Sequence, residues 1–430
     1  MQIAAQRGLQ PLPYLLPITW VVLIATASLW GNELVAHEPR IRLASPPLFA
    51  RFEPQISLWV APALILAAFA LVYLPPAVSK LRWSRVVWLI GLVAIVWPAA
   101  LALTDGPSGI TRGLESSHDY LDAVPRVDSL ATLGASFVDE IARFPIHVQG
   151  HPPGFLTLLT LVDRAGLGGS GWAAALVLFG AALAPVAVLV VIRDVMDEAA
   201  ARRAAPFLVL APAAIWIGTS ADAFFAGIGA AAVAAAVVAS SRDGRRRIAV
   251  SASAGTLGAM ALLLSYGLVL LAVVALPLLV ARRAWDVIAV SAVTTVVLLI
   301  LTAAVSGFNI VEGLAATQER YLAGVSQHRP FSFFLVANLA AFALALGPAV
   351  FAPTRGIPSR LGPLALGALA AVALADLSGF SKGEVERIWL PFAPWLLWVA
   401  AFAERWSLRT RLTLQVAVGL GLELIVVTPW

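Results

Sequence analysis

The sequence contains no cysteine, almost no lysine and few charged residues of any kind. Without cysteine the chain forms no disulfide, has no thiolate nucleophile and binds no metal through sulfur. Charged residues make up 12% of the 430 residues, hydrophobic residues make up 60%, and the mean hydropathy is +0.89. A water-soluble globular protein has roughly 25% charged residues, so this composition excludes that class. The formal net charge of +5 resides mostly on arginines, many of them in short loops, which is not a nucleic-acid-binding pattern.

Apolar segments of roughly 17 to 25 residues recur along the chain, which is the length that a helix needs to cross a hydrocarbon core of about 30 Å. The segments are continuously apolar rather than alternating, so helices are favoured over the strands of a barrel. We therefore predict an all-α polytopic membrane protein with about 13 transmembrane helices. Residues 1–430 form one transmembrane domain without a separate soluble domain. The predicted spans are 13–32, 57–75, 86–104, 171–192, 204–218, 221–240, 248–265, 267–281, 285–306, 333–351, 361–378, 388–403 and 411–428.

Basic residues next to the spans predict the orientation, because cytoplasmic loops of membrane proteins are rich in arginine and lysine. Placing Lys80 and the arginines of 242–247 in the cytoplasm gives a multi-pass protein of the cell membrane. Its N-terminus is then cytoplasmic, and its C-terminus and the segment 105–153 lie outside. The apolar segment 154–168 is short and ends in a glycine-rich break. If it crossed the membrane, the cluster at 242–247 would face outward, so we predict a re-entrant or interfacial segment.

The longest polar interruption is the segment 105–153, which holds three of the five histidines. Polar segments of this length are uncommon unless they are functional or disordered. Apolar residues such as Tyr120 and Phe137 favour a folded segment over disorder. We predict an outer-face loop with short amphipathic helices, for example over residues 129–143.

Three acids in this loop are candidate catalytic residues. Asp105 follows an apolar span directly, where a carboxyl near the apolar phase can have a raised pKa and act as a base. The alternative is an interfacial aspartate that terminates the helix. Asp119 and Asp122 lie within one turn of His118 and together supply an imidazole and two carboxylates.

The histidines of this loop allow two interpretations. His147 and His151 have the four-residue spacing of a metal pair. Prolines at 145, 152 and 153 disfavour a regular helix through them, so we predict no metal site. His151 stands at the start of an apolar segment, where we predict a contact to substrate or phosphate.

Three further groups of polar residues fall on the predicted outer side. Asp222 begins an apolar span, where helix capping is the simpler explanation. Lys382, Glu384 and Arg387 form a charged cluster at the bilayer edge, and there we predict phosphate binding, with pairing inside the cluster as the alternative. The segment 312–330 contributes Arg320 and Tyr321 as candidate contacts, although such residues also anchor helices at the interface.

These residues resemble the layout of the GT-C superfamily of membrane glycosyltransferases, which includes protein mannosyltransferases, oligosaccharyltransferase catalytic subunits and aminoarabinose transferases. In that family an acidic residue follows a helix at the start of a large first outer loop, and a Pro-Pro pair opens the next helix. Here Asp105 and the sequence His-Pro-Pro-Gly at 151–154 occupy those places, and residues 86–240 carry the correspondence. The family usually has paired acids where this chain has Asp105 alone, so Asp119, Asp122 and Glu140 remain alternatives.

The resemblance implies an integral membrane enzyme that moves a sugar from a polyprenyl-phosphate donor, reached through the membrane lipid, to an acceptor on the outer face. Asp105 or a rival acid would deprotonate the acceptor hydroxyl. Arg387, Lys382, His151 or Arg320 would stabilise the leaving phosphate. Direct displacement would invert the anomeric centre. No cofactor is required by this scheme, and a divalent cation stays an open alternative.

Two other functions are compatible with the sequence. A multi-span transporter would place charged residues at mid-membrane and often has two similar halves. The predicted spans are largely free of charge at their centres, and no similarity between halves is evident. A non-enzymatic scaffold for cell-envelope assembly would use the outer residues only as a binding surface.

Overall fold

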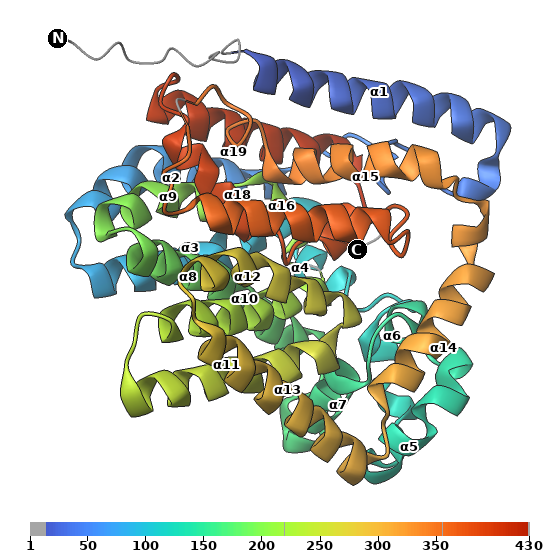
Figure 1. Cartoon of the computed structure of the whole chain (residues 1–430). Coiled ribbons are helices and arrows are strands. Elements are labelled where there is room, and N and C mark those ends of the chain that lie inside the picture. Colours follow the sequence, from blue (N-terminus) through green and yellow to red (C-terminus); the bar gives the residue numbers. More distant parts are fainter. Residues whose placement is uncertain (1–13, 219, 355, 429–430) are drawn as a thin grey trace.

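The computed structural model describes residues 14–428 except 219 and 355, and this part of the chain is almost entirely helical (Figure 1). Seven of its helices are long and apolar enough to cross a membrane. They are α1 Leu15–His37, α2 Ala61–Lys80, α3 Trp83–Ala102, α8 Ser170–Val195, α10 Ala221–Ala239, α11 Gly244–Leu264 and α13 Trp285–Ser306. The prediction of an all-α chain is therefore confirmed, and seven of its helices are candidates to span a membrane.

Three shorter apolar helices occupy other predicted spans: α12 Leu271–Ala281 after the turn η9 Tyr266–Leu270, α15 Phe331–Leu346 and α16 Gly362–Leu377. The last predicted span is occupied by α19 Leu408–Ile425, which has 18 residues and carries three charged side chains. A 16-residue helix such as α15 or α16 is only about 24 Å long, less than the ~30 Å of a hydrocarbon core. The total of about 13 spans stays a prediction.

Two predicted spans are not single helices, which corrects the sequence interpretation. Residues 204–218 comprise the end of α9 Glu198–Val209 and the 3₁₀ turn η8 Pro212–Trp216. Residues 388–403 are divided among α17 Val385–Ile388, α18 Pro394–Leu397 and η11 Trp398–Phe402. Prolines interrupt the helical hydrogen bonds in both segments. The second segment is buried inside the protein, with Trp389, Trp395 and Trp398 at most 1% exposed. Irregular backbone in a membrane protein is tolerated where other parts of the protein bury it.

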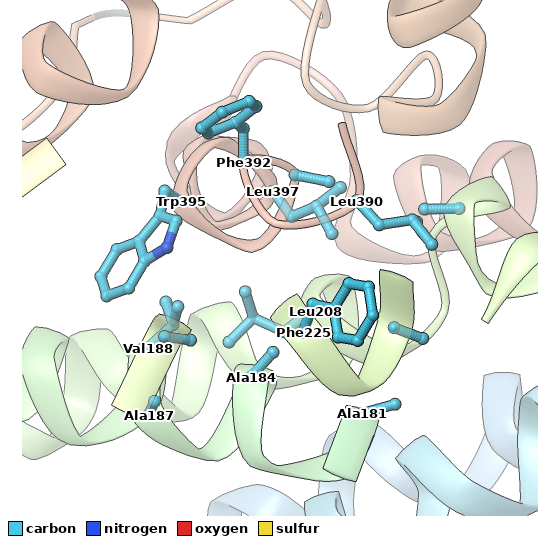
Figure 2. Packing of buried hydrophobic residues seen from close by; sticks show 14 of the residues in the cluster. Ala181, Ala184, Ala187, Val188, Leu208, Phe225, Leu390, Phe392, Trp395 and Leu397 are labelled. Atoms are coloured by element: carbon cyan, nitrogen blue, oxygen red, sulfur yellow. The ribbon is translucent and has the colours of Figure 1, made fainter. Parts of the chain in front are cut away.

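Small residues set the packing of α8 against α10 at the centre of the bundle. Alanines of α8 lie beneath the bulky side chains of α18 and the residues before it, including Trp395 and Phe392 (Figure 2). A Cβ added to Gly227 of α10 would stand 1.8 Å from the carbonyl oxygen of Gly180 in α8. The two backbones approach this closely only because neither residue has a side chain.

Replacing Gly227 by alanine is expected to lower the free energy of unfolding by about 1–3 kcal/mol, because the added methyl group overpacks the contact between α8 and α10. Gly171→Ala in the first turn of α8 is the matched control, since a Cβ there meets no atom within 4 Å. Unfolding of both variants in mixed micelles measures the difference. Equal stability of the two would contradict the close approach.

The segment 105–153 is folded, as predicted, into short helical pieces. These are η3 Leu103–Asp105, α4 Gly109–Arg112, η4 Tyr120–Asp122, η5 Val124–Arg126, α5 Leu130–Glu140, η6 Ile141–Arg143 and α6 Ile146–Gln149. The helix predicted over 129–143 corresponds to α5 and η6. Tyr120 and Phe137 are at most 2% exposed and anchor the segment by apolar burial.

The next segment, 154–168, is too short to cross a membrane. It forms the nine-residue helix α7 Gly154–Val162, followed by the π turn η7 Asp163–Leu167. Nine residues extend only about 14 Å along a helix axis. In Figure 1, α7 lies with α5, α6 and the peripheral helix α14 Ile310–Ala323 at one end of the molecule.

The remaining elements connect the ends of the bundle. The 3₁₀ turns are η1 Pro39–Ile41, η2 Leu58–Val60 and η10 Val325–His328. The strand β1 Arg51–Phe52 pairs antiparallel with β2 Val426–Val427, with Arg51 opposite Val427. This pairing ties the loop between α1 and α2 to the end of α19.

Candidate functional site

Ionisable side chains from four separate segments meet where α10 begins. We call this group the Asp222 network, and it consists of His151, Asp222, Arg329, Glu384 and Arg387. The residues come from the end of the polar segment 105–153, the start of α10, the residue before Pro330, and the α17 region. Three of the residues predicted to bind substrate or phosphate, His151, Glu384 and Arg387, meet here.

Asp222 is the centre of the network and is 3% exposed. Ser220 is the N-cap of α10: its Oγ accepts a hydrogen bond from the Asp222 amide at 3.2 Å and donates one to Oδ2 at 2.9 Å. The guanidinium of Arg387 donates to the same Oδ2 at 2.5 Å. Ser220 and not Asp222 caps the helix, and the favourable interaction of an acid with a helix N-terminus explains an aspartate in the first turn. The ion pair to a side chain from α17 is a further interaction that capping does not require.

The ring of His151 lies near the other carboxylate oxygen of Asp222, with 3.8 Å between His151 Nε2 and Asp222 Oδ1. Its Nδ1 donates to the carbonyl of His147 at 2.7 Å, which fixes the ring. Burial lowers the pKa of His151. The neutral ring with the proton on Nδ1 therefore presents the Nε2 lone pair beside a carboxylate, where it can accept a proton.

Tyr120 completes the surroundings of His151, and their ring centroids are 6.1 Å apart. Tyr120 is 2% exposed, and its hydroxyl has no hydrogen-bond partner among the residues that the structure describes. Burial raises the pKa of Tyr120, so its hydroxyl keeps its proton. A buried hydroxyl without a protein partner is uncommon, and it is available to hydrogen-bond a substrate.

The three acids predicted as catalytic residues have different positions. Asp119 is 3% exposed and accepts a hydrogen bond from Nδ1 of His147 at 2.9 Å, next to the network. Asp122 pairs instead with Arg126 at a partly exposed position. Asp119 is thus linked to His151 through His147, whose carbonyl accepts a hydrogen bond from the His151 ring.

Asp105 lies outside the Asp222 network and pairs with Arg112. The preceding residue, Thr104, donates to Glu423 of α19 at 2.7 Å. The turn before α10 packs on the same end of α3, because a Cβ at Gly218 would lie 3.5 Å from the Cβ of Ala102. Asp105 and Asp222 therefore belong to neighbouring segments, without a hydrogen bond or ion pair between them among the described residues.

The four other predicted binding residues divide into two groups. Glu384 accepts from Arg387 Nη2 at 3.2 Å and so joins the network. Lys382 donates from Nζ to the carbonyl of Ser326 at 3.2 Å, and its amide donates to the Tyr321 hydroxyl at 3.0 Å. Arg320 is exposed and donates to Gln149 at 3.1 Å. Lys382, Tyr321 and Arg320 thus hold α14 against the loops around the network.

Arg329 lies in the candidate segment 312–330 but was not singled out there, and Asn338 was not predicted. Arg329 is 7% exposed and donates to the carbonyls of Ile41 and Lys382. Asn338 of α15 donates to the carbonyl of Ser381 at 2.6 Å and accepts from the Gly383 amide at 3.0 Å. The sequence signal for Arg329 is its position at the start of an apolar helix. The signal for Asn338 is a polar side chain inside that helix.

Glu386 is a fully buried acid beside the network, and its Oε1 accepts a hydrogen bond from the amide of Phe49 at 3.1 Å. Burial raises the pKa of Glu386 to about 7. In the unfolded chain the group titrates near its ordinary pKa of 4.5. The folded protein therefore binds this proton more tightly, and stability falls as the pH rises from about 4.5 to about 7.

Replacing Glu386 by glutamine is expected to remove this fall in the free energy of unfolding with pH, which is on the order of 1–3 kcal/mol. The variant should be more stable than the wild type at pH 8 and show a flatter dependence between pH 5 and pH 8. Unfolding in micelles over that pH range measures it. A variant whose profile is parallel to the wild type would show that another group titrates.

An apolar cavity lies directly beside the network, between α3, α8, α10 and α18. Ala223, which follows Asp222, and Leu390, which follows Arg387 by three residues, are among its lining residues. Figure 2 shows this region, with Leu390 and Leu397 facing Ala181 and Ala184. The charged groups thus border an apolar interior on one side.

Within residues 14–428, positions 219 and 355 aside, no three histidine or acidic side chains are grouped so as to hold a metal ion. His147 and His151 contact different carboxylates, those of Asp119 and Asp222. Comparison with protein-family models, with curated proteins and with solved structures finds no match to this chain. The geometry of the Asp222 network is therefore the basis on which a function can be inferred.

Proposed function

We propose that this protein is an integral membrane glycosyltransferase of the GT-C kind, which moves a sugar from a polyprenyl-phosphate donor to an acceptor hydroxyl on the outer face of the membrane. The observation that carries the proposal is the buried contact of Arg387 and His151 with Asp222 at one end of an apolar helical bundle. Ionisable groups in such surroundings are costly, and they mark functional sites more often than structural ones.

The location of these groups favours chemistry at a surface over a conduction path. Asp222 is the second residue of α10, Arg387 belongs to the four-residue helix α17, and His151 precedes α7. All three therefore lie at helix ends or in loops. A transporter would place such residues at mid-membrane, often at paired interrupted helices in two similar halves, and no similarity between halves is evident in this sequence.

The proposed reaction is a direct displacement. The acceptor oxygen attacks the anomeric carbon, and the bond between that carbon and the phosphate oxygen breaks with inversion. A carboxylate takes the acceptor proton, and Asp105 is our first candidate, with Asp119 and Asp122 as alternatives. The leaving phosphate keeps the electron pair of the broken bond. We assign stabilisation of its charge to Arg387, and to His151 once its Nε2 has taken up a proton.

The test is incubation of the purified protein in lipid nanodiscs with a panel of radiolabelled polyprenyl-phosphate sugars, with chromatography of the lipid products. Release of free polyprenyl phosphate by the wild type, lost in His151→Ala, is the expected result. His118→Ala is the matched control, because His118 is exposed and its ring hydrogen-bonds to its near neighbour Ser116. No release and no binding with any donor would overturn the proposal.

A further inference from the structure

Glu384 lies between two buried arginines from distant parts of the chain. Its Oε1 is 3.8 Å from Nη1 of Arg329, and its Oε2 is 3.2 Å from Nη2 of Arg387. The side chains of the arginines are 7% and 6% exposed, whereas that of Glu384 is 24% exposed. The carboxylate therefore covers two guanidinium groups on the side from which solvent reaches them.

The backbone of Glu384 is strained at this position. Its φ of +64° is in the left-handed region, which side chains other than those of glycine, asparagine and aspartate seldom adopt. Gly383, directly before it, has a φ of +91°. A glutamate in this conformation persists only where other contacts hold it, and the two arginines supply such contacts.

We propose that Arg329 and Arg387 form the binding site for a phosphate group and that the carboxylate of Glu384 occupies this site until the phosphate displaces it. This inference rests on the proposed function for the identity of the ligand, a lipid phosphate. Each arginine already lies next to a different oxygen of the Glu384 carboxylate. Guanidinium groups bind the oxygens of a phosphate in the same way.

Occupation by Glu384 gives the buried Arg329 a counter-charge and gives Arg387 a second one beside Asp222. An unpaired buried charge costs several kcal/mol, and the glutamate supplies a counter-charge. A phosphate carries at least the same charge and more acceptor oxygens, so it can replace the carboxylate. The glutamate side chain then moves to solvent, which it already reaches. Affinity for phosphate is lowered by the need to displace Glu384.

The proposal is tested with Glu384→Gln, which keeps the size of the side chain and removes its charge. Binding of farnesyl phosphate to the protein in nanodiscs is measured by isothermal titration, with inorganic phosphate and farnesol as comparison probes. Farnesyl phosphate should bind the variant about fivefold or more tightly than the wild type. Glu319→Gln is the matched control, since Glu319 is exposed on α14 and should leave the affinity unchanged.

The two probes distinguish the source of the phosphate. A gain with farnesyl phosphate alone assigns a lipid phosphate, and an equal gain with inorganic phosphate assigns a site for phosphate in general. Farnesol should show no gain in either case. Weaker or unchanged binding of farnesyl phosphate by Glu384→Gln overturns the inference, and so does absence of binding to both proteins. The proposed function is judged separately, by release of polyprenyl phosphate from the donor panel.

Discussion

Arg387→Ala is expected to lower the free energy of unfolding by about 3–5 kcal/mol, because it leaves buried carboxylates without their cation. Asp222 is 3% exposed and loses the guanidinium that donates to its Oδ2. Glu384 loses its contact at 3.2 Å. Arg387 is therefore a residue on which folding depends, whatever its part in substrate binding.

Unfolding in mixed micelles, followed by tryptophan fluorescence, measures this change. The double variant Asp222→Asn/Arg387→Ala should recover part of the lost stability, since one unpaired charge is then removed. Arg320→Ala is the matched control, because Arg320 is exposed and should change stability little. A loss below about 1 kcal/mol for Arg387→Ala, as for exposed ion pairs, would show that the contact with Asp222 is not maintained.

Asp105→Asn is expected to reduce the rate of sugar transfer by about 10²–10⁴, which is the contribution of a positioned general base. Stability should change by less than about 1 kcal/mol, since the partner of Asp105 is a half-exposed arginine and such pairs contribute little. The side chains of Asp105 and Arg112 are 17% and 52% exposed. Transfer by the nanodisc protein and unfolding in micelles measure the two quantities.

The variant Arg112→Gln distinguishes the role of the Asp105 carboxylate from that of its ion pair with Arg112. That variant keeps Asp105 and removes its partner, so we expect transfer to continue. Asp119→Asn and Asp122→Asn, assayed in parallel, identify the base if it is not Asp105. Full activity in Asp105→Asn with loss in Asp119→Asn would move the role to the acid that contacts His147.

The seven long helices and the folded segment 105–153 could be predicted from the sequence because both depend on local properties. The apolar length of α8 or α13 is a property of consecutive residues, and a helix satisfies its own backbone hydrogen bonds without a partner segment. The breaks in 204–218 and 388–403 were missed because hydropathy does not report proline interruptions. In 388–403 the irregular backbone is tolerated because the fold buries it.

His151, Glu384 and Arg387 were also found from the sequence, because ionisable residues at the ends of apolar segments are conspicuous there. Only the tertiary structure decided which charges meet. Asp222 and Arg387 are 165 residues apart in the chain, and Arg329 reaches Glu384 from another segment. Periodicity and composition describe a residue and its close neighbours, whereas ion-pair partners follow from how α10, α15 and α17 pack. The sequence by itself therefore determined which residues are candidates, and packing decided that Asp222, not Asp105, contacts His151 and Arg387.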